Sequence, residues 1–164
     1  MRKVSLAAIA ALVLAVASVT LASASGSSSA TQTSDKQSTQ VIHLVARTVQ
    51  EASLDLGEPG DSLGDQFIFS EDLFRDGKKV GHDGGVCTLV RLVPRVSATT
   101  QCVVTASLPK GQITVQGLPT FTEGPASFLL AITGGTGAYK TAHGQVKVVE
   151  VSEVESRLTL FLIL

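Results

Sequence analysis

The sequence has no tryptophan, few aromatic side chains and no cluster of basic residues. Phe and Tyr make up 4% of the 164 residues, and the chain contains 13 basic residues (Lys and Arg) and 14 acidic residues (Asp and Glu). Proteins that bind nucleic acid or an anionic membrane surface carry a basic patch, often with stacking aromatics. No such patch occurs along this chain, which argues against both classes of partner.

The chain also lacks the short motifs of metal sites and common hydrolases. It contains no His-x-x-x-His, Cys-x-x-Cys or calcium loop, and no Gly-x-Ser-x-Gly elbow. The run Gly134–Gly137 precedes neither a Lys-Ser/Thr pair nor a helix, so it is not a phosphate loop. We therefore predict neither a metal nor a cofactor. Turn and cap roles account for most of the scattered acidic residues, which are Asp61, Asp65, Asp72, Asp76 and Asp83.

The N-terminal segment has the pattern of a secretory signal peptide. Arg2 and Lys3 precede an apolar, alanine-rich run that ends near Leu21, and Ala22-Ser23-Ala24 offers the small residues of a cleavage site. Residues 1–24 are predicted to be a signal peptide, with a retained membrane anchor as the alternative. Residues 25–40 form a Ser/Thr-rich leader too polar to fold. The mature chain is expected to be secreted, free of the membrane, with 11 basic and 14 acidic residues.

Helical periodicity is absent after Gln40. The remaining sequence, residues 41–164, shows alternating or short β-branched apolar runs broken every 8 to 15 residues by Gly, Pro or Asp. It predicts eight strands, at about 40–50, 65–73, 80–93, 99–108, 112–117, 127–133, 143–151 and 157–163. Closure into an antiparallel β-barrel would remove exposed strand edges. A β-sandwich is the alternative fold for the same pattern.

Three glycine-rich sites predict sharp turns. Asp76-Gly77 is typical of a two-residue hairpin turn. Gly84-Gly85 indicates a bulge or barrel corner inside a strand. Gly134, Gly135 and Gly137 mark a crowded corner between two strands, next to Tyr139.

Cys87 and Cys102 are the only cysteines. They lie at equal distances from the turn signal at Pro94 and Arg95, which would place them opposite each other on neighbouring strands. In an oxidising compartment this position favours a disulfide. A reactive Cys87 thiol is the alternative.

Several short motifs recur in order along the domain and carry a family resemblance. They are Ser62-Leu63-Gly64-Asp65, Phe69, Lys78-Lys79-Val80-Gly81, Gly85-Val86-Cys87, Val115-Gln116-Gly117, Phe128, Leu130–Gly135 and Gly144-Gln145-Val146-Lys147. The pattern resembles the plant allene oxide cyclases, and its Gly-Gly-Thr-Gly turn is similar to that of dirigent proteins. The resemblance implies an eight-stranded barrel with a ligand cavity and a homotrimer.

The resemblance also implies where a site would lie, and where this chain departs from the plant enzymes. The first-strand Glu-x-Asn of those enzymes falls on His43 and Val45, a second asparagine on Glu71, and a cavity tyrosine near Phe121. Only the cysteine is retained, as Cys87. These departures argue against the plant reaction. We take His43, Glu71 and Cys87 as candidate catalytic residues and Phe69, Phe121 and Phe128 as cavity wall.

Each candidate has a plainer interpretation. His43 and Glu71 could face solvent on the outside of the barrel, and the phenylalanines could simply pack the core. Two functions remain open. The first is a barrel that binds a small apolar or phenolic molecule and steers a cyclisation, isomerisation or coupling. The second is a non-catalytic binding or interaction barrel, whose pocket would be filled or purely apolar.

Overall fold

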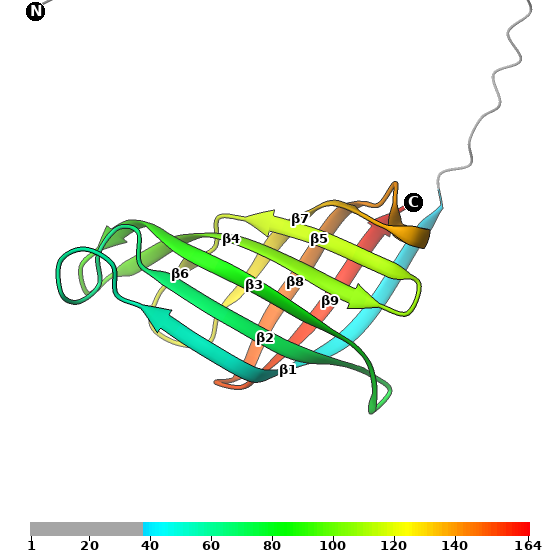
Figure 1. The fold of residues 1–164 in the computed structure, drawn as a ribbon, viewed down its shortest axis with the longest axis horizontal. Helices are drawn as coiled ribbons and strands as arrows, with labels where there is room; N and C mark the ends of the chain where they lie inside the picture. The colour runs from blue at the N-terminus through cyan, green and yellow to red at the C-terminus, as the bar shows by residue number, and fades with distance from the viewer. Residues whose placement is uncertain (1–37) are drawn as a thin grey trace, which may run out of the picture. The chain divides into compact units, whose positions relative to one another are not determined.

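Residues 38–164 are described by a computed structural model, and they form a β-barrel (Figure 1). The predicted signal peptide, and residues 25–37 of the predicted leader, lie outside the described residues. The strands are β1 (Thr39–Leu54), β2 (Gln66–Arg75), β3 (Lys78–Val93), β4 (Ser97–Leu108), β5 (Gly111–Gly117), β6 (Thr120–Phe121), β7 (Ser127–Gly135), β8 (His143–Ser152) and β9 (Glu155–Ile163).

The barrel closes through antiparallel pairs. Neighbouring strands pair in the order β1, β2, β3, β4, β5, β7, β8 and β9, and β9 returns to β1. The two-residue strand β6 lies outside this ring and pairs with the start of β4. The predicted eight-stranded antiparallel barrel is confirmed. Closure leaves none of the eight ring strands with an unpaired edge.

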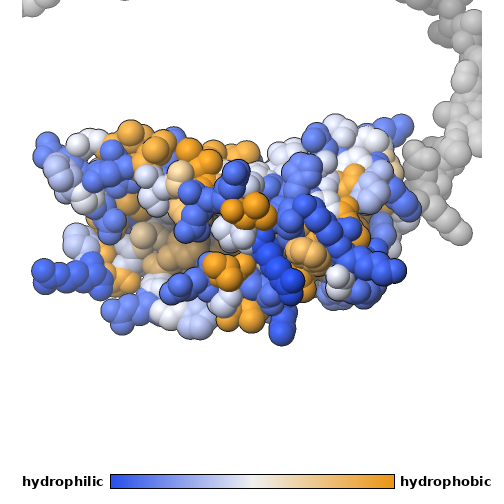
Figure 2. All heavy atoms as spheres, turned by 60° about the horizontal axis from the view of Figure 1, so that its bottom comes forward, coloured by the Kyte–Doolittle hydropathy of each residue, from blue (hydrophilic) through white to orange (hydrophobic). Residues whose placement is uncertain are grey.

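The strand alternation separates an apolar interior from a mixed exterior. Side chains that point inward are buried, among them Ile42 and Leu44 of β1 and Leu160 and Leu162 of β9. Apolar side chains also lie exposed on the outer face, such as Val103 and Leu129. Figure 2 shows such apolar residues scattered among hydrophilic ones over one face. Within residues 38–164 no helix is long and apolar enough to cross a membrane.

The turn between β2 and β3 has the predicted hairpin geometry. Asp76 and Gly77 both have positive φ, 50° and 75°, as a type I′ turn requires. Of the bulge or barrel corner that we expected at Gly84-Gly85, the bulge is wrong, because the pairing with β2 and β4 runs through both residues without a shift. The bulges fall instead at Val80 and Val90, where the register slips by one residue.

The predicted glycine corner closes one end of the barrel. A 3₁₀ turn (η1, Gly137–Tyr139) follows β7, and its Tyr139 side chain is buried. A Cβ on Gly135 would lie 2.3 Å from the Gln112 carbonyl oxygen, so a larger residue does not fit there. Tyr139 and Ala142 belong to the buried cluster together with Ile42, Leu73 and Leu162. This packing fills the barrel at the end where the C-terminus lies.

Candidate active site

A cavity of about 690 Å³ occupies the other half of the barrel. Its lining includes Pro125, between β6 and β7, and Glu153, between β8 and β9, and these connections lie at the end of the barrel away from the C-terminus. Figure 2 shows a recess with apolar walls in the same half. The volume falls within the range of small-molecule sites. An eight-stranded barrel has room for one such ligand if its interior is not filled by side chains.

Two pairs of aromatic rings form part of the cavity wall. Phe67 and Phe69 of β2 stack with ring centroids 5.8 Å apart. Phe121 and Phe128 meet edge to face with centroids 5.4 Å apart. The three phenylalanines that we took as cavity wall, Phe69, Phe121 and Phe128, all line the cavity. They give it apolar, partly aromatic walls.

Glu71 and Asp83 place two carboxyl groups in this cavity. Glu71 of β2 pairs with Asp83 of β3 across the sheet, and both side chains line the cavity. Asp83 is only 4% exposed. Its Oδ1 atom has no hydrogen-bond partner among the described residues. Thr48, which pairs with Glu71 from β1, completes the polar row.

Burial makes this carboxyl pair hard to ionise. It raises the pKa of Asp83 to about 8, and the nearby Glu71 charge and a hydrogen bond with Glu71 act in the same direction. Burial also raises the pKa of Glu71, while hydrogen bonds from Asp83 and Thr48 oppose that rise. Two carboxylates side by side in a poorly solvated site do not both ionise readily. Near neutral pH Asp83 therefore carries the proton, and Glu71 is the carboxylate of the pair.

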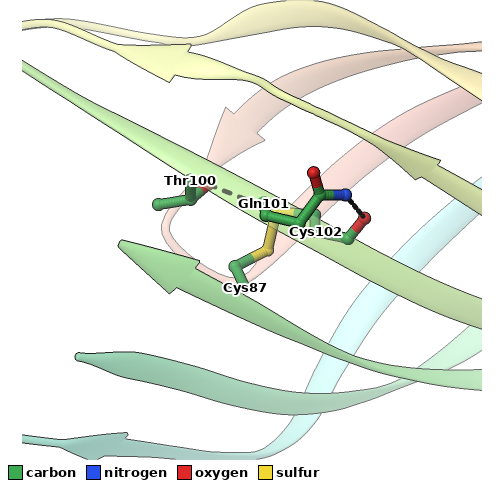
Figure 3. The surroundings of a disulfide bond; sticks show 4 residues. All are labelled: Cys87, Thr100, Gln101 and Cys102. Carbon is green, nitrogen blue, oxygen red and sulfur yellow. Dashed lines mark hydrogen bonds between the residues drawn. A yellow bond between two sulfur atoms is a disulfide. The ribbon is translucent and has the colours of Figure 1, made fainter. Parts of the chain in front are cut away.

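A disulfide forms another part of the wall. Cys87 of β3 and Cys102 of β4 are directly opposite each other and bonded, and both line the cavity (Figure 3). The Thr100 hydroxyl lies 3.3 Å from the Cys102 sulfur. Because Cys87 is bonded, the expectation of a catalytic Cys87 thiol is wrong.

His43 lies outside the cavity. It is exposed on β1, with its Nδ1 atom 3.3 Å from the Thr159 hydroxyl oxygen. Its neighbours Ile42 and Leu44 are buried, and alternation along a strand then turns His43 to the outer face. The expectation that His43 is a catalytic residue of the cavity is therefore wrong, and its alternative position on the outside of the barrel is the one observed. Glu71 does face the cavity, and a catalytic role for it stays a prediction.

Asp83 is a functional residue that the sequence analysis missed. Asp65 does serve a turn, because its carboxylate accepts hydrogen bonds from the backbone N–H groups of Leu56 and Ser62, which lower its pKa. Asp83 instead lies within β3, facing inward. The signal was present: Asp83 and Cys87 are four residues apart, so on a regular strand they share one face.

No group of three or more His, Cys, Asp and Glu side chains within residues 38–164 is arranged to hold a metal ion. The polar centre of the cavity is the carboxyl pair.

Comparison with known proteins identifies the family. The chain matches the sequence profile described as the allene oxide cyclase barrel like domain over residues 24–163. It belongs to the allene oxide cyclase-like barrel family. Comparison with curated proteins gives no match. Among solved structures, the barrel is similar to a pyocyanin demethylase with 37% identity and a TM-score of 0.68, covering 75% of this chain and 99% of that one.

More distant members of this barrel fold catalyse cycloadditions. An exo-specific intermolecular Diels–Alderase is 12% identical with a TM-score of 0.61, covering 77% of this chain and 98% of that one. A heme-binding cyclase that catalyses a [4 + 2] cycloaddition in neoabyssomicin biosynthesis is 14% identical with a TM-score of 0.60, covering 78% and 68%. At this identity the likeness concerns the fold alone.

Proposed function

We propose that this protein binds a small, largely apolar or phenolic molecule in its barrel and rearranges it by proton transfer, as in an isomerisation or cyclisation. The observation that carries the proposal is the Glu71–Asp83 pair inside an otherwise mostly apolar cavity. The open cavity with inward carboxyl groups is what a catalytic barrel requires. A barrel that only binds neutral apolar molecules has no need of a carboxyl pair that is costly to bury.

One carboxyl group of the pair can accept a proton from the substrate while the other donates one to it. Glu71, as the carboxylate, removes a proton from a bound substrate, while Asp83, as the neutral acid, delivers its proton to another atom of the same substrate. The net change is an isomerisation with no external oxidant or reductant. A carboxyl group with a pKa near the working pH is effective in this role. The apolar walls fix the substrate so that the proton moves between chosen atoms.

Pyocyanin is the first substrate to test, because the solved relative at 37% identity is a pyocyanin demethylase. The purified protein is incubated with pyocyanin, and loss of substrate and formation of product are followed by absorbance and mass spectrometry. An unchanged mass indicates an isomer, and a mass lower by one methylene indicates demethylation. Related neutral aromatic and phenolic compounds follow in the same assay.

Matched variants connect turnover with the carboxyl pair. Asp83→Asn and Glu71→Gln keep the shape of each side chain and remove its acid–base function, so both are expected to lose at least a hundredfold in kcat. Glu58→Gln, on the exposed β1–β2 connection outside the cavity, is the control. Binding with no chemical change by the unmodified protein would favour the non-catalytic binding barrel. Undiminished turnover by both cavity variants would show that the carboxyl pair takes no part in the reaction.

Export and assembly are part of the same proposal. We propose that the chain is secreted after cleavage behind Ala24, on the basis of its N-terminal sequence. N-terminal sequencing of the protein recovered outside the cell tests this.

A homotrimer, implied by the resemblance, is supported by apolar side chains on the outer strands, such as Ile68 and Val103 at 40% and 46% exposure. Light scattering after gel filtration measures the mass in solution. Any phenolic coupling of the dirigent type also stays a prediction.

A further inference from the structure

The cavity has an unusual charge composition. Six acidic residues line it, and no Lys, Arg or His of the described residues does. The six are Glu51, Glu71, Asp83, Glu150, Glu153 and Glu155. A cleft lined by charges of one sign concentrates their field and draws in ligands of the opposite sign. The bias is local, because basic and acidic residues are nearly balanced over the whole chain.

Protein partners offset only part of this charge. Glu155 Oε2 lies 3.0 Å from Arg47 Nε, and Glu150 Oε2 accepts a hydrogen bond from the Ala126 backbone N–H at 3.0 Å. Glu51 and Glu153 are exposed at the mouth, where water solvates them. The inner pair differs, since Asp83 is nearly fully buried and its Oδ1 has no hydrogen-bond partner among the described residues.

The unpartnered atom specifies what a ligand must bring. An oxygen of a carboxyl group that is not donating a proton can only accept, so a donor or a positively charged atom satisfies it. A buried acceptor without a partner lowers stability, and a ligand that donates to it would remove that penalty on binding. The phenylalanine faces along the wall attract cations as well, because the face of an aromatic ring is electronegative. An anionic ligand would be repelled by the same groups.

We infer that the cavity is selective for a flat organic cation whose positive charge or N–H donor lies against the Glu71–Asp83 pair and whose aromatic body lies between the phenylalanines. This inference rests on the proposed function, because it names the substrate class of the same cavity. It excludes fatty-acid carboxylates and other anions as substrates. The aromatic walls supply affinity for the ligand body, and the carboxyl groups select its charge.

A charge series on one tricyclic skeleton tests the inference. The probes are 9-aminoacridine, a cation with N–H donors at neutral pH, acridone, which is neutral, and acridine-9-carboxylate, which is an anion. Each is titrated into the protein at low salt, and its fluorescence gives Kd. We expect 9-aminoacridine to bind at least tenfold more tightly than acridone, and the carboxylate to bind most weakly. Added sodium chloride is expected to weaken the binding of the cation alone.

Variants separate the charge effect from packing. The double substitution Glu51→Gln with Glu153→Gln is expected to weaken 9-aminoacridine binding three- to tenfold and to leave acridone binding unchanged. Glu58→Gln, an exposed acidic residue outside the cavity, is the matched control. Acridone or the carboxylate binding as tightly as the cation would overturn the inference, as would failure of all three probes to bind.

The outcome is independent of turnover. Selective binding of the cation, together with no chemical change of any substrate in the assays above, would support the inference and refute the proposed catalysis. Turnover of neutral compounds, with no preference for the cation, would support the proposed catalysis and refute the inference of charge selectivity.

Discussion

Glu71 of β2 lies opposite Asp83 of β3, not opposite the adjacent His82. The hairpin turn at Asp76-Gly77 would, with regular pairing, bring Glu71 and His82 together. The bulge at Val80 adds one residue to β3, so that Asp83 meets Glu71 and His82 meets Asp72. One extra residue thus places a carboxyl group, not an imidazole, beside Glu71.

The pH dependence of stability should reveal the proton on Asp83. The pKa of this carboxyl is about 8 in the folded state, above its ordinary value of 3.8, so the folded protein holds a proton that the unfolded chain has lost. The contribution of Asp83 to the free energy of unfolding is therefore fully present below about pH 4 and is lost as the pH rises to about 8. The slope reaches at most about 1.4 kcal/mol per pH unit.

Asp83→Asn isolates this effect because asparagine does not titrate. The free energy of unfolding, measured with urea at several pH values, should rise for Asp83→Asn relative to the wild type between pH 4 and 8. Glu123→Gln, on an exposed loop, should follow the wild type. A constant difference between Asp83→Asn and the wild type across this range would show that Asp83 ionises normally.

Gly85 gives the Phe69 ring its space. A Cβ on Gly85 would lie 2.7 Å from Val104 Cγ2, 2.8 Å from the Val103 carbonyl oxygen and 3.0 Å from Phe69 Cζ. Gly85→Ala should lower stability by about 1–3 kcal/mol through overpacking and should weaken ligand binding by moving the ring. Thermal unfolding and probe titration measure the two effects.

The adjacent Gly84 offers a matched control, since its Cβ would come no closer than 3.3 Å to another atom. Gly84→Ala should cost less stability and leave probe affinity unchanged. Equal effects at the two glycines would mean that crowding at Phe69 is not the cause.

The Cys87–Cys102 disulfide should stabilise the barrel. The two cysteines are 15 residues apart, and a loop of that size gives about 3 kcal/mol in the chain-entropy account. Replacing both with serine should lower the free energy of unfolding by up to that amount. The wild type measured with a reducing agent should lose a similar amount, and the double serine variant should not respond to the reductant. Stability that is unaffected by either change would contradict this role.

Arg47 should moderate the negative charge at the mouth. Its guanidinium contacts Glu155 and lies 4.9 Å above the Phe74 ring, while 57% of the side chain is exposed. Arg47→Met should lower stability by less than about 1 kcal/mol, because an exposed ion pair contributes little. The same change leaves Glu155 without its ion-pair partner and should tighten 9-aminoacridine binding up to about fivefold. Arg91→Met, an exposed residue outside the cavity lining, is the control. Weaker binding of the cation to Arg47→Met would count against a ligand attracted by charge.

The strands could be predicted closely from the sequence, but the register could not. Alternation and turn residues identified all eight barrel strands, because each strand has one face in the interior and six of the eight end at or next to Gly, Pro or Asp. The bulges at Val80 and Val90 have no comparable signal. Valine suits a regular strand, and the extra residue is fixed by how β3 pairs with its neighbours across the barrel.

The candidate site could likewise be predicted only in part from the sequence. Glu71, Phe69 and Phe128 lie on predicted strands whose inward face follows from the pattern, whereas Phe121 lies in the two-residue strand β6, which the sequence did not predict. His43 was placed wrongly because its role came from a position in the resemblance, although the buried neighbours on either side turn it outward. Asp83 was missed because an aspartate after a histidine and before two glycines reads as a turn. Its pairing with Glu71 depends on the bulge.

The buried Tyr139 and its neighbours seal the far end of the barrel, and this has a kinetic consequence. A molecule formed at the carboxyl pair has to leave by the mouth through which the next substrate arrives. The two therefore compete for one passage, and a product that keeps the positive charge of its precursor is retained by the same glutamates that attracted it. Product release, rather than the chemical step, would then limit the rate of each catalytic cycle.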